Sequence, residues 1–69
     1  MTEQLYAIYD KLAEEYGPLF DAQNEAVAQR KYLTSLKKHD LKEEEYVLTF
    51  IGTYDTDKGL IIAKEHFDN

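Results

Sequence analysis

The absence of cysteine from a chain of only 69 residues constrains its fold more than any other feature. Neither a disulfide nor a thiolate-bound zinc ion can brace the core, and one core of this size leaves little net stability. We therefore expect a single small domain, residues 1–69, that gains stability by forming a homodimer. Because 43% of the residues are apolar, the chain can bury a core and is not a disordered chain.

The distribution of apolar residues also bears on location. The longest uncharged run, residues 46–54, is too short for a transmembrane helix, so we expect no membrane association. The first residues lack the basic and apolar regions of a secretory signal. Both observations predict a cytoplasmic protein.

The second half of the chain has the pattern of a β-hairpin. Residues 46–54 and 60–63 are rich in β-branched and aromatic side chains, and residues 55–59 carry turn-forming types. Gly59 is expected to adopt a positive φ in this turn, and Gly52 is expected to mark a β-bulge. We expect four apolar residues of this region to bury surface in the core or across a dimer interface, namely Val47, Ile51, Leu60 and Ile62.

The middle of the chain predicts an amphipathic helix over residues 25–38, with Asn24 as its N-cap. The helical spacing predicts one buried stripe made of Ala26, Gln29, Tyr32, Leu33 and Leu36. A basic flank borders this stripe and contains Arg30, Thr34, Lys38, Lys31 and Lys37.

The first segment allows two interpretations. A helical spacing is shared by Leu5, Ile8, Tyr9, Leu12 and Tyr16. The Gly-Pro pair at 17–18 would end a helix over residues 3–16. Residues 5–9 are also rich enough in aromatic residues for a strand, with residues 19–22 returning beside it. The local pattern favours the helix, and it leaves the hairpin open.

The charges are unevenly distributed. The formal net charge of −6 disfavours non-specific binding to nucleic acid, yet five of the eight basic residues lie within residues 30–42. Basic side chains on adjacent helical turns can reach successive phosphates, and exposed tyrosines can stack on unpaired bases. The predicted nucleic-acid-binding residues are Arg30, Lys31, Lys37, Lys38, Tyr9 and Tyr54. Lysines in the last turn also complement the helix dipole, which is a purely structural explanation of their position.

No constellation in the sequence indicates catalysis. His39 and His66 lie in polar runs without a recognisable acid/base partner, and a chain this short leaves little volume for a protected pocket. The glutamates at 43–45 have no spacing typical of a metal site, and we interpret them as a solvated loop that keeps the following strand soluble. We expect no enzymatic activity, metal or cofactor.

Several blocks along the chain carry a family resemblance. They are Ile8-Tyr9-Asp10-Lys11, Phe20-x-Ala22-x-Asn24, Ala28-x-Arg30-x-Tyr32, Glu45-Tyr46-x-Leu48, Ile51-Gly52-x-Tyr54-Asp55 and Gly59, with Ala13, Tyr16 and Pro18 between them. In this order and spacing they resemble the small nonstructural protein of gokushovirus-type microviruses, which are phages with single-stranded DNA genomes. The resemblance implies strands at residues 6–10 and 19–22, and it therefore overrides the local helical pattern. The expected fold is α+β, with two β-hairpins flanking one α-helix in ββαββ order and an antiparallel sheet that carries the helix on one face.

The resemblance also implies a function. It suggests a nonstructural accessory protein of the phage, located in the host cytoplasm, that acts in DNA replication and DNA packaging during single-strand genome synthesis. The implied partners are single-stranded DNA and the replication or procapsid proteins. The alternative from the charge is an acidic protein-interaction module that inhibits a host DNA-binding protein.

Overall fold

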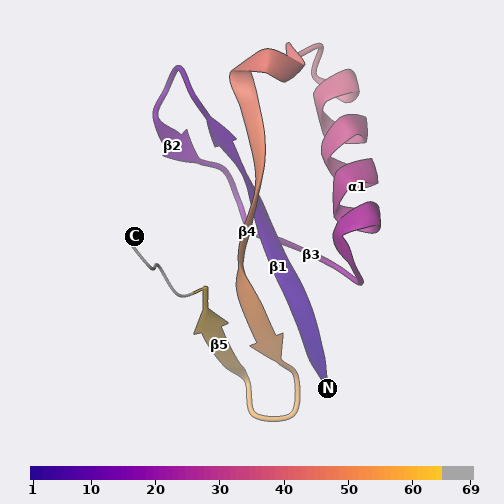
Figure 1. Ribbon diagram of the computed structural model, residues 1–69, viewed down its shortest axis with the longest axis vertical. Coiled ribbons are helices and arrows are strands. Elements are labelled where there is room, and N and C mark those ends of the chain that lie inside the picture. The colour runs from indigo at the N-terminus through magenta and orange to yellow at the C-terminus, as the bar shows by residue number, and fades with distance from the viewer. Residues whose placement is uncertain (65–69) are drawn as a thin grey trace.

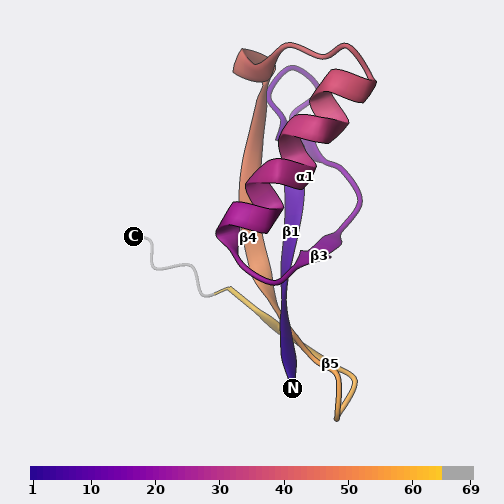
Figure 2. The same ribbon diagram turned by 90° about the vertical axis from the view of Figure 1, so that its right-hand side faces the viewer.

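The computed structural model, which describes residues 1–64, is an α+β fold with one α-helix against a five-stranded antiparallel sheet (Figure 1). The elements in chain order are β1 (Thr2–Asp10), β2 (Glu15–Tyr16), β3 (Phe20–Ala22), α1 (Glu25–Lys38), the 3-10 helix η1 (Glu43–Glu45), β4 (Tyr46–Asp55) and β5 (Leu60–Ala63). The strand order is β2-β1-β4-β5, and β3 also pairs with β1. Helix α1 covers one face of β1 and β4, whereas the β4–β5 turn extends beyond the helix (Figures 1 and 2).

The strand interpretation of the first segment is confirmed, and the helix over residues 3–16 is wrong. β1 runs along β4 from Thr2↔Asp55 to Asp10↔Tyr46, so its backbone groups are satisfied by a partner far away in sequence. The exact ββαββ order is not observed, because the strand returning beside β1 is split into β2 and β3. Gly17 and Pro18 interrupt it, since proline has no N–H to donate to a ladder.

Two turns at opposite ends of β1 and β4 share one hydrogen-bond pattern. Oδ1 of Asp10 accepts from the amides two and three residues later, at 3.0 and 3.1 Å, and Oδ1 of Asp55 does the same at 2.9 and 3.2 Å. In both turns the fifth residue donates its N–H to the carbonyl of the first at 2.8 Å. This fifth residue has a positive φ, 68° at Gly59 as expected and 59° at Glu14. The first turn is thus a single helical turn, which accounts for the helix-favouring residues in it.

Glu14 therefore occupies a position that suits glycine. Replacing Glu14 with glycine is expected to stabilise the fold by about 1 kcal/mol, because a left-handed conformation is strained for a residue with a Cβ. Urea unfolding of the parent and of Glu14→Gly measures the difference. Glu14→Ala is the control, since it removes the same carboxylate and keeps the strain. A lower midpoint for Glu14→Gly would contradict this account of the turn.

The core lies between the sheet and α1 and is centred on Tyr6. Its ring stacks on Phe20 at a centroid distance of 6.0 Å and meets Phe50 edge-on at 5.5 Å. Ala22 and Ala28 complete the buried cluster, and neither has a side chain large enough to hold the helix away from the sheet. The close approach of helix and sheet therefore depends on these two small residues.

A β-bulge in β4 decides which of its side chains enter the core. Leu5 pairs with Gly52 and Tyr6 with Phe50, so Ile51 is the extra residue. This confirms the bulge expected beside Gly52. Before the bulge, Leu48 and Phe50 are the side chains that pack against the core.

In a single chain, the buried core contains none of the four residues Val47, Ile51, Leu60 and Ile62, and their burial across a dimer interface stays a prediction. Val47, Leu60 and Ile62 are exposed, and Ile51 is half-buried. Val47 lies on the face of the sheet away from α1, because side chains alternate along a strand. Leu60 and Ile62 belong to the edge strand β5, where one side has no neighbour among the described residues.

Helix α1 begins as predicted, with Asn24 Oδ1 accepting from the Val27 N–H at 2.9 Å. Tyr32 and Leu36 of the predicted stripe are buried, which confirms that part of it. The buried face is nevertheless shifted, because Ala28 is buried whereas Ala26, Gln29 and Leu33 are exposed. The hydroxyl of Tyr32 donates to the carbonyl oxygen of Tyr46 at 2.9 Å. This contact and the small Ala28 set the rotation of the helix on the sheet. In the described part of the chain, no helix is long and apolar enough to cross a membrane.

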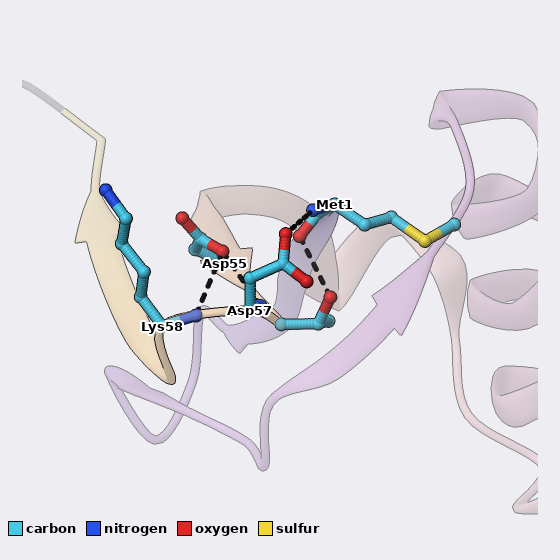
Figure 3. A network of polar contacts seen from close by, with 5 residues as sticks. Met1, Asp55, Asp57 and Lys58 are labelled. Atoms are coloured by element: carbon cyan, nitrogen blue, oxygen red, sulfur yellow. Dashed lines mark hydrogen bonds and ion pairs between the residues drawn. The ribbon is translucent and has the colours of Figure 1, made fainter.

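The start of β1 is tied to the β4–β5 turn (Figure 3). The amino group of Met1 donates to Asp57 Oδ2 at 2.7 Å, and the Met1 carbonyl accepts from the N–H and the hydroxyl of Thr56 at 2.8 and 3.0 Å. Both members of the ion pair are solvent-exposed, so the pair itself contributes little to stability. The backbone hydrogen bond extends the β1–β4 ladder into the turn.

Candidate nucleic-acid interface

The outer face of α1 carries the basic residues. Because Ala28, Tyr32 and Leu36 face the sheet, the helical period directs Arg30 and Lys37 away from it, and both are exposed. Lys31 and Lys38 are also exposed and lie towards one side of this face. The four predicted basic residues therefore share one solvent-facing surface of one helix.

Three of these four side chains border the same shallow hollow. Its lining residues are Arg30, Lys31, Thr34, Ser35, Lys38 and His39. Lys37 is outside it. The hollow thus combines three positive charges with the hydroxyls of Thr34 and Ser35, and both kinds of group donate hydrogen bonds to phosphate oxygens. We call these three cations, Arg30, Lys31 and Lys38, the basic triad.

Within residues 1–64, no carboxylate forms an ion pair with the triad. Among residues 1–64, the single ion pair in the structure joins Met1 and Asp57. Lys31 Nζ donates to the backbone carbonyl oxygen of Asp21 at 2.7 Å, which ties the helix to β3 and leaves two of its N–H groups for other acceptors. As far as the described residues extend, an anion would not have to displace an ion pair of the triad.

Tyr9 and Tyr54 lie on the other face of the sheet. Tyr6 faces α1, so the alternation along β1 directs Glu3 and Tyr9 to the opposite face, and Tyr54 shares that face because it is paired with Glu3. The Tyr9 ring contacts the ring of Tyr16 at a centroid distance of 4.7 Å. The expectation that Tyr9, Tyr16 and Tyr54 are at least partly exposed is confirmed. The structure does not bring Tyr9 or Tyr54 together with the basic residues.

A neighbouring apolar hollow is lined by an aromatic side chain, Phe20, that was not among the predicted nucleic-acid-binding residues. Phe20, Leu19 and Pro18 line it, and it shares Lys31 and Ser35 with the basic hollow. Phe20 is half-buried and Leu19 is 52% exposed. The alternation of Phe20 and Ala22 before the Asn24 cap was the available signal, since it places Phe20 on the face that α1 covers.

In the part of the chain that the structure describes, the histidine and the carboxylates do not converge on a metal site. His39 caps the end of α1 with its N–H donated to the Ser35 carbonyl at 3.2 Å, and its side chain borders the basic hollow. His66 lies outside the described residues. Glu43 and Glu44 are exposed on η1, where a solvated loop was expected. No group of three or more metal-ligating side chains occurs within residues 1–64.

Three tyrosines are held in their neutral form. Burial, followed by the nearby carboxylate of Glu25, raises the pKa of Tyr6 above its ordinary value of 10.0. Burial and then Glu43 raise the pKa of Tyr32 in the same way. For Tyr46 the causes are burial, then Asp10 and Glu45. Two of these phenols donate hydrogen bonds within the fold, Tyr6 to Gln4 Oε1 and Tyr32 to the Tyr46 carbonyl oxygen.

Comparison with known proteins assigns the chain to a family. Residues 3–67 match the family described as Phage ORF5 protein, which is nearly the whole chain. No curated protein and no solved structure matches it. The chain belongs to the Phage ORF5 protein family.

Proposed function

We propose that this phage protein is a nonstructural accessory protein that binds single-stranded DNA through the outer face of α1. The observation that carries the proposal is the basic triad, three exposed cations around one hollow with no carboxylate paired to them in residues 1–64. Arg30 and Lys38 are eight residues apart, which is about 12 Å along a helix, so they can contact different phosphates of one strand. The surrounding hydroxyls of Thr34 and Ser35 add neutral donors.

The apolar hollow beside the triad suits an unpaired base. Leu19 and Phe20 offer an apolar surface next to Lys31, so a phosphate at the triad would place its neighbouring base near these side chains. Duplex DNA keeps its bases stacked inside the helix and could use only the phosphate contacts. Single-stranded DNA is therefore the better fit of the two.

The biological setting of the proposal comes from the resemblance to the small nonstructural protein of gokushovirus-type microviruses. In such a phage the protein would act in DNA replication and packaging during single-strand genome synthesis, and replication or procapsid proteins would be further partners. The alternative of an acidic inhibitor needs rows of carboxylates along one face. Glu43 and Glu44 instead lie at one end of β4, while Asp55 and Asp57 lie at the other (Figure 1), which does not favour it.

The test is a charge reversal with a matched control. The variant Arg30→Glu/Lys31→Glu/Lys38→Glu is expected to lose measurable binding to a fluorescent oligo-dT at low salt. The control Lys11→Glu/Lys58→Glu/Lys64→Glu changes the net charge by the same amount at exposed positions away from α1 and should retain binding. Fluorescence anisotropy measures both affinities, and circular dichroism verifies that each variant is folded.

The salt dependence adds a quantitative criterion. Replacing the triad with glutamine should reduce the slope of log K against log salt by about 2, since each phosphate contact with a single strand contributes about 0.7. Absence of binding by the parent protein at low salt would overturn the proposal. Equal losses in the triad variant and in the control would show that net charge, and not the α1 face, is responsible.

A further inference from the structure

The two edges of the sheet are protected very differently. Along β1, the outer edge is occupied by β2 and β3, which are only two and three residues long and are separated by Gly17, Pro18 and Leu19. Short strands and proline are typical protections against edge pairing. β5 forms the other edge and carries no charge within its four residues, of which Leu60, Ile61 and Ile62 are 57%, 58% and 59% exposed.

The hydrogen bonds of the β4–β5 ladder show which groups of β5 point outward. The Lys64 N–H donates to the Ile51 carbonyl oxygen at 2.7 Å, and these two residues continue the register in which Ile62 pairs with Thr53. Hydrogen-bonded and non-hydrogen-bonded pairs alternate along an antiparallel ladder. Ile62 therefore directs its backbone groups towards β4, and Ile61 and Ala63 direct their N–H and C=O groups to the free edge.

We propose that β5 pairs antiparallel with β5 of a second copy. The two-fold axis of this dimer passes midway between the Ile62 residues of the two copies. In this register Ile61 lies opposite Ala63 of the partner subunit, and the two symmetric pairs form four backbone hydrogen bonds. The two Ile62 side chains face each other across the axis in a non-hydrogen-bonded pair, where side chains are closest. The sheets of both copies join into one.

The partner is a second copy because the edge is self-complementary in size and charge. The small Ala63 leaves room for the bulky Ile61 opposite it. Lys64 lies opposite the partner's Leu60, so no like charges meet within the described residues. A register centred on Ile61 would instead place Lys58 opposite Lys64 of the partner subunit, and like charges directly opposite are destabilising. Two chains that each carry a net charge of −6 repel each other overall. β5 contains no charged residue, so two β5 strands can come into contact without bringing like charges together.

The symmetry has a consequence for the helices. A two-fold axis through an antiparallel strand pair runs perpendicular to the sheet, so it keeps both α1 helices on the same face of the joined sheet. Two basic triads would then lie on one side of the dimer. This pairing does not depend on DNA binding, and its test uses no DNA.

The absence of cysteine from the chain makes the register directly testable. Single variants Leu60→Cys, Ile61→Cys and Ile62→Cys are oxidised under mild conditions and separated on a non-reducing gel. Ile62→Cys should form a disulfide-linked dimer in large excess over the other two, because only residue 62 faces itself across the axis at a Cβ separation of about 4.5–5.5 Å. Preferential cross-linking of Ile61→Cys or Leu60→Cys would overturn the register.

Sedimentation equilibrium tests the association itself. The parent protein should sediment at twice the chain mass at micromolar concentrations, and Ile62→Asp should be monomeric because two carboxylates would face each other at the axis. Leu33→Asp is the matched control, an equal charge change at an exposed position of α1, and it should remain dimeric. A monomeric parent, or a dimer that survives Ile62→Asp in folded protein, would overturn the proposal.

Discussion

Replacing Gly52 with alanine is expected to detach β5 from the sheet and to destabilise the protein by about 1–3 kcal/mol or more. A Cβ on residue 52 would lie 2.3 Å from the carbonyl oxygen of Ile62 and 3.0 Å from the Cα of Ala63. Both neighbours are backbone atoms, so no side-chain rotation relieves the overlap. The strand must move, and its hydrogen bonds with β4 must lengthen or break.

Hydrogen exchange measures this effect locally and urea unfolding measures it globally. In Gly52→Ala the Lys64 amide, which donates to the Ile51 carbonyl oxygen in the parent, should lose its protection while the amides of β1 retain theirs. Gly17→Ala is the control, because the nearest atom to its Cβ, the Ile8 carbonyl oxygen, is 3.6 Å away. A Gly52→Ala protein as stable as the parent, with a protected Lys64 amide, would show that β5 is not held as closely to β4 as described.

Truncating Tyr6 to alanine is expected to unfold the chain. Tyr6 is 4% exposed and contacts the rings of Phe20 and Phe50, so it joins β3 and β4 through β1. Truncation of a buried aromatic residue costs about 3–5 kcal/mol. A single core in a domain of this size supplies only about 3–5 kcal/mol in total. The far-ultraviolet circular dichroism of Tyr6→Ala should therefore be that of an unfolded chain at room temperature.

Two further variants test whether the effect depends on the Tyr6 hydroxyl and whether truncation of an exposed tyrosine has the same effect. Tyr6→Phe removes only the 2.6 Å hydrogen bond to Gln4 Oε1 and should cost about 1 kcal/mol. Tyr16→Ala truncates a tyrosine that is 56% exposed and should leave the protein folded. If Tyr16→Ala were as damaging as Tyr6→Ala, the contact between the Tyr9 and Tyr16 rings would contribute as much to stability as the core between the sheet and α1.

The basic face could be predicted from the sequence, whereas the proposed aromatic partners could not. Once residues 25–38 form a helix, the helical period alone places Arg30, Lys31 and Lys38 on neighbouring turns. The face on which Tyr9 and Tyr54 lie depends on the β1–β4 register and on the bulge at Ile51, which reverses the alternation along β4. A bulge of one residue is enough to move every side chain beyond it to the other face.

Elements that are stabilised by interactions between residues close in the chain follow from the sequence alone. The Asn24 cap, the β4–β5 turn with Gly59 at positive φ, and the β-branched strand after residue 45 each depend on residues a few positions apart. The strand conformation of β1 and the rotation of α1 on the sheet depend instead on contacts between residues far apart in the chain. Residues 2–10 carry both helical and strand patterns, and they become a strand because β4, some forty residues later, satisfies their backbone groups. Helical periodicity predicts the burial of Tyr32 and Leu36, but not the burial of Ala28 in place of Ala26, Gln29 and Leu33. That rotation depends on how α1 packs on the sheet, where the Tyr32 hydroxyl donates to the Tyr46 carbonyl oxygen fourteen positions away.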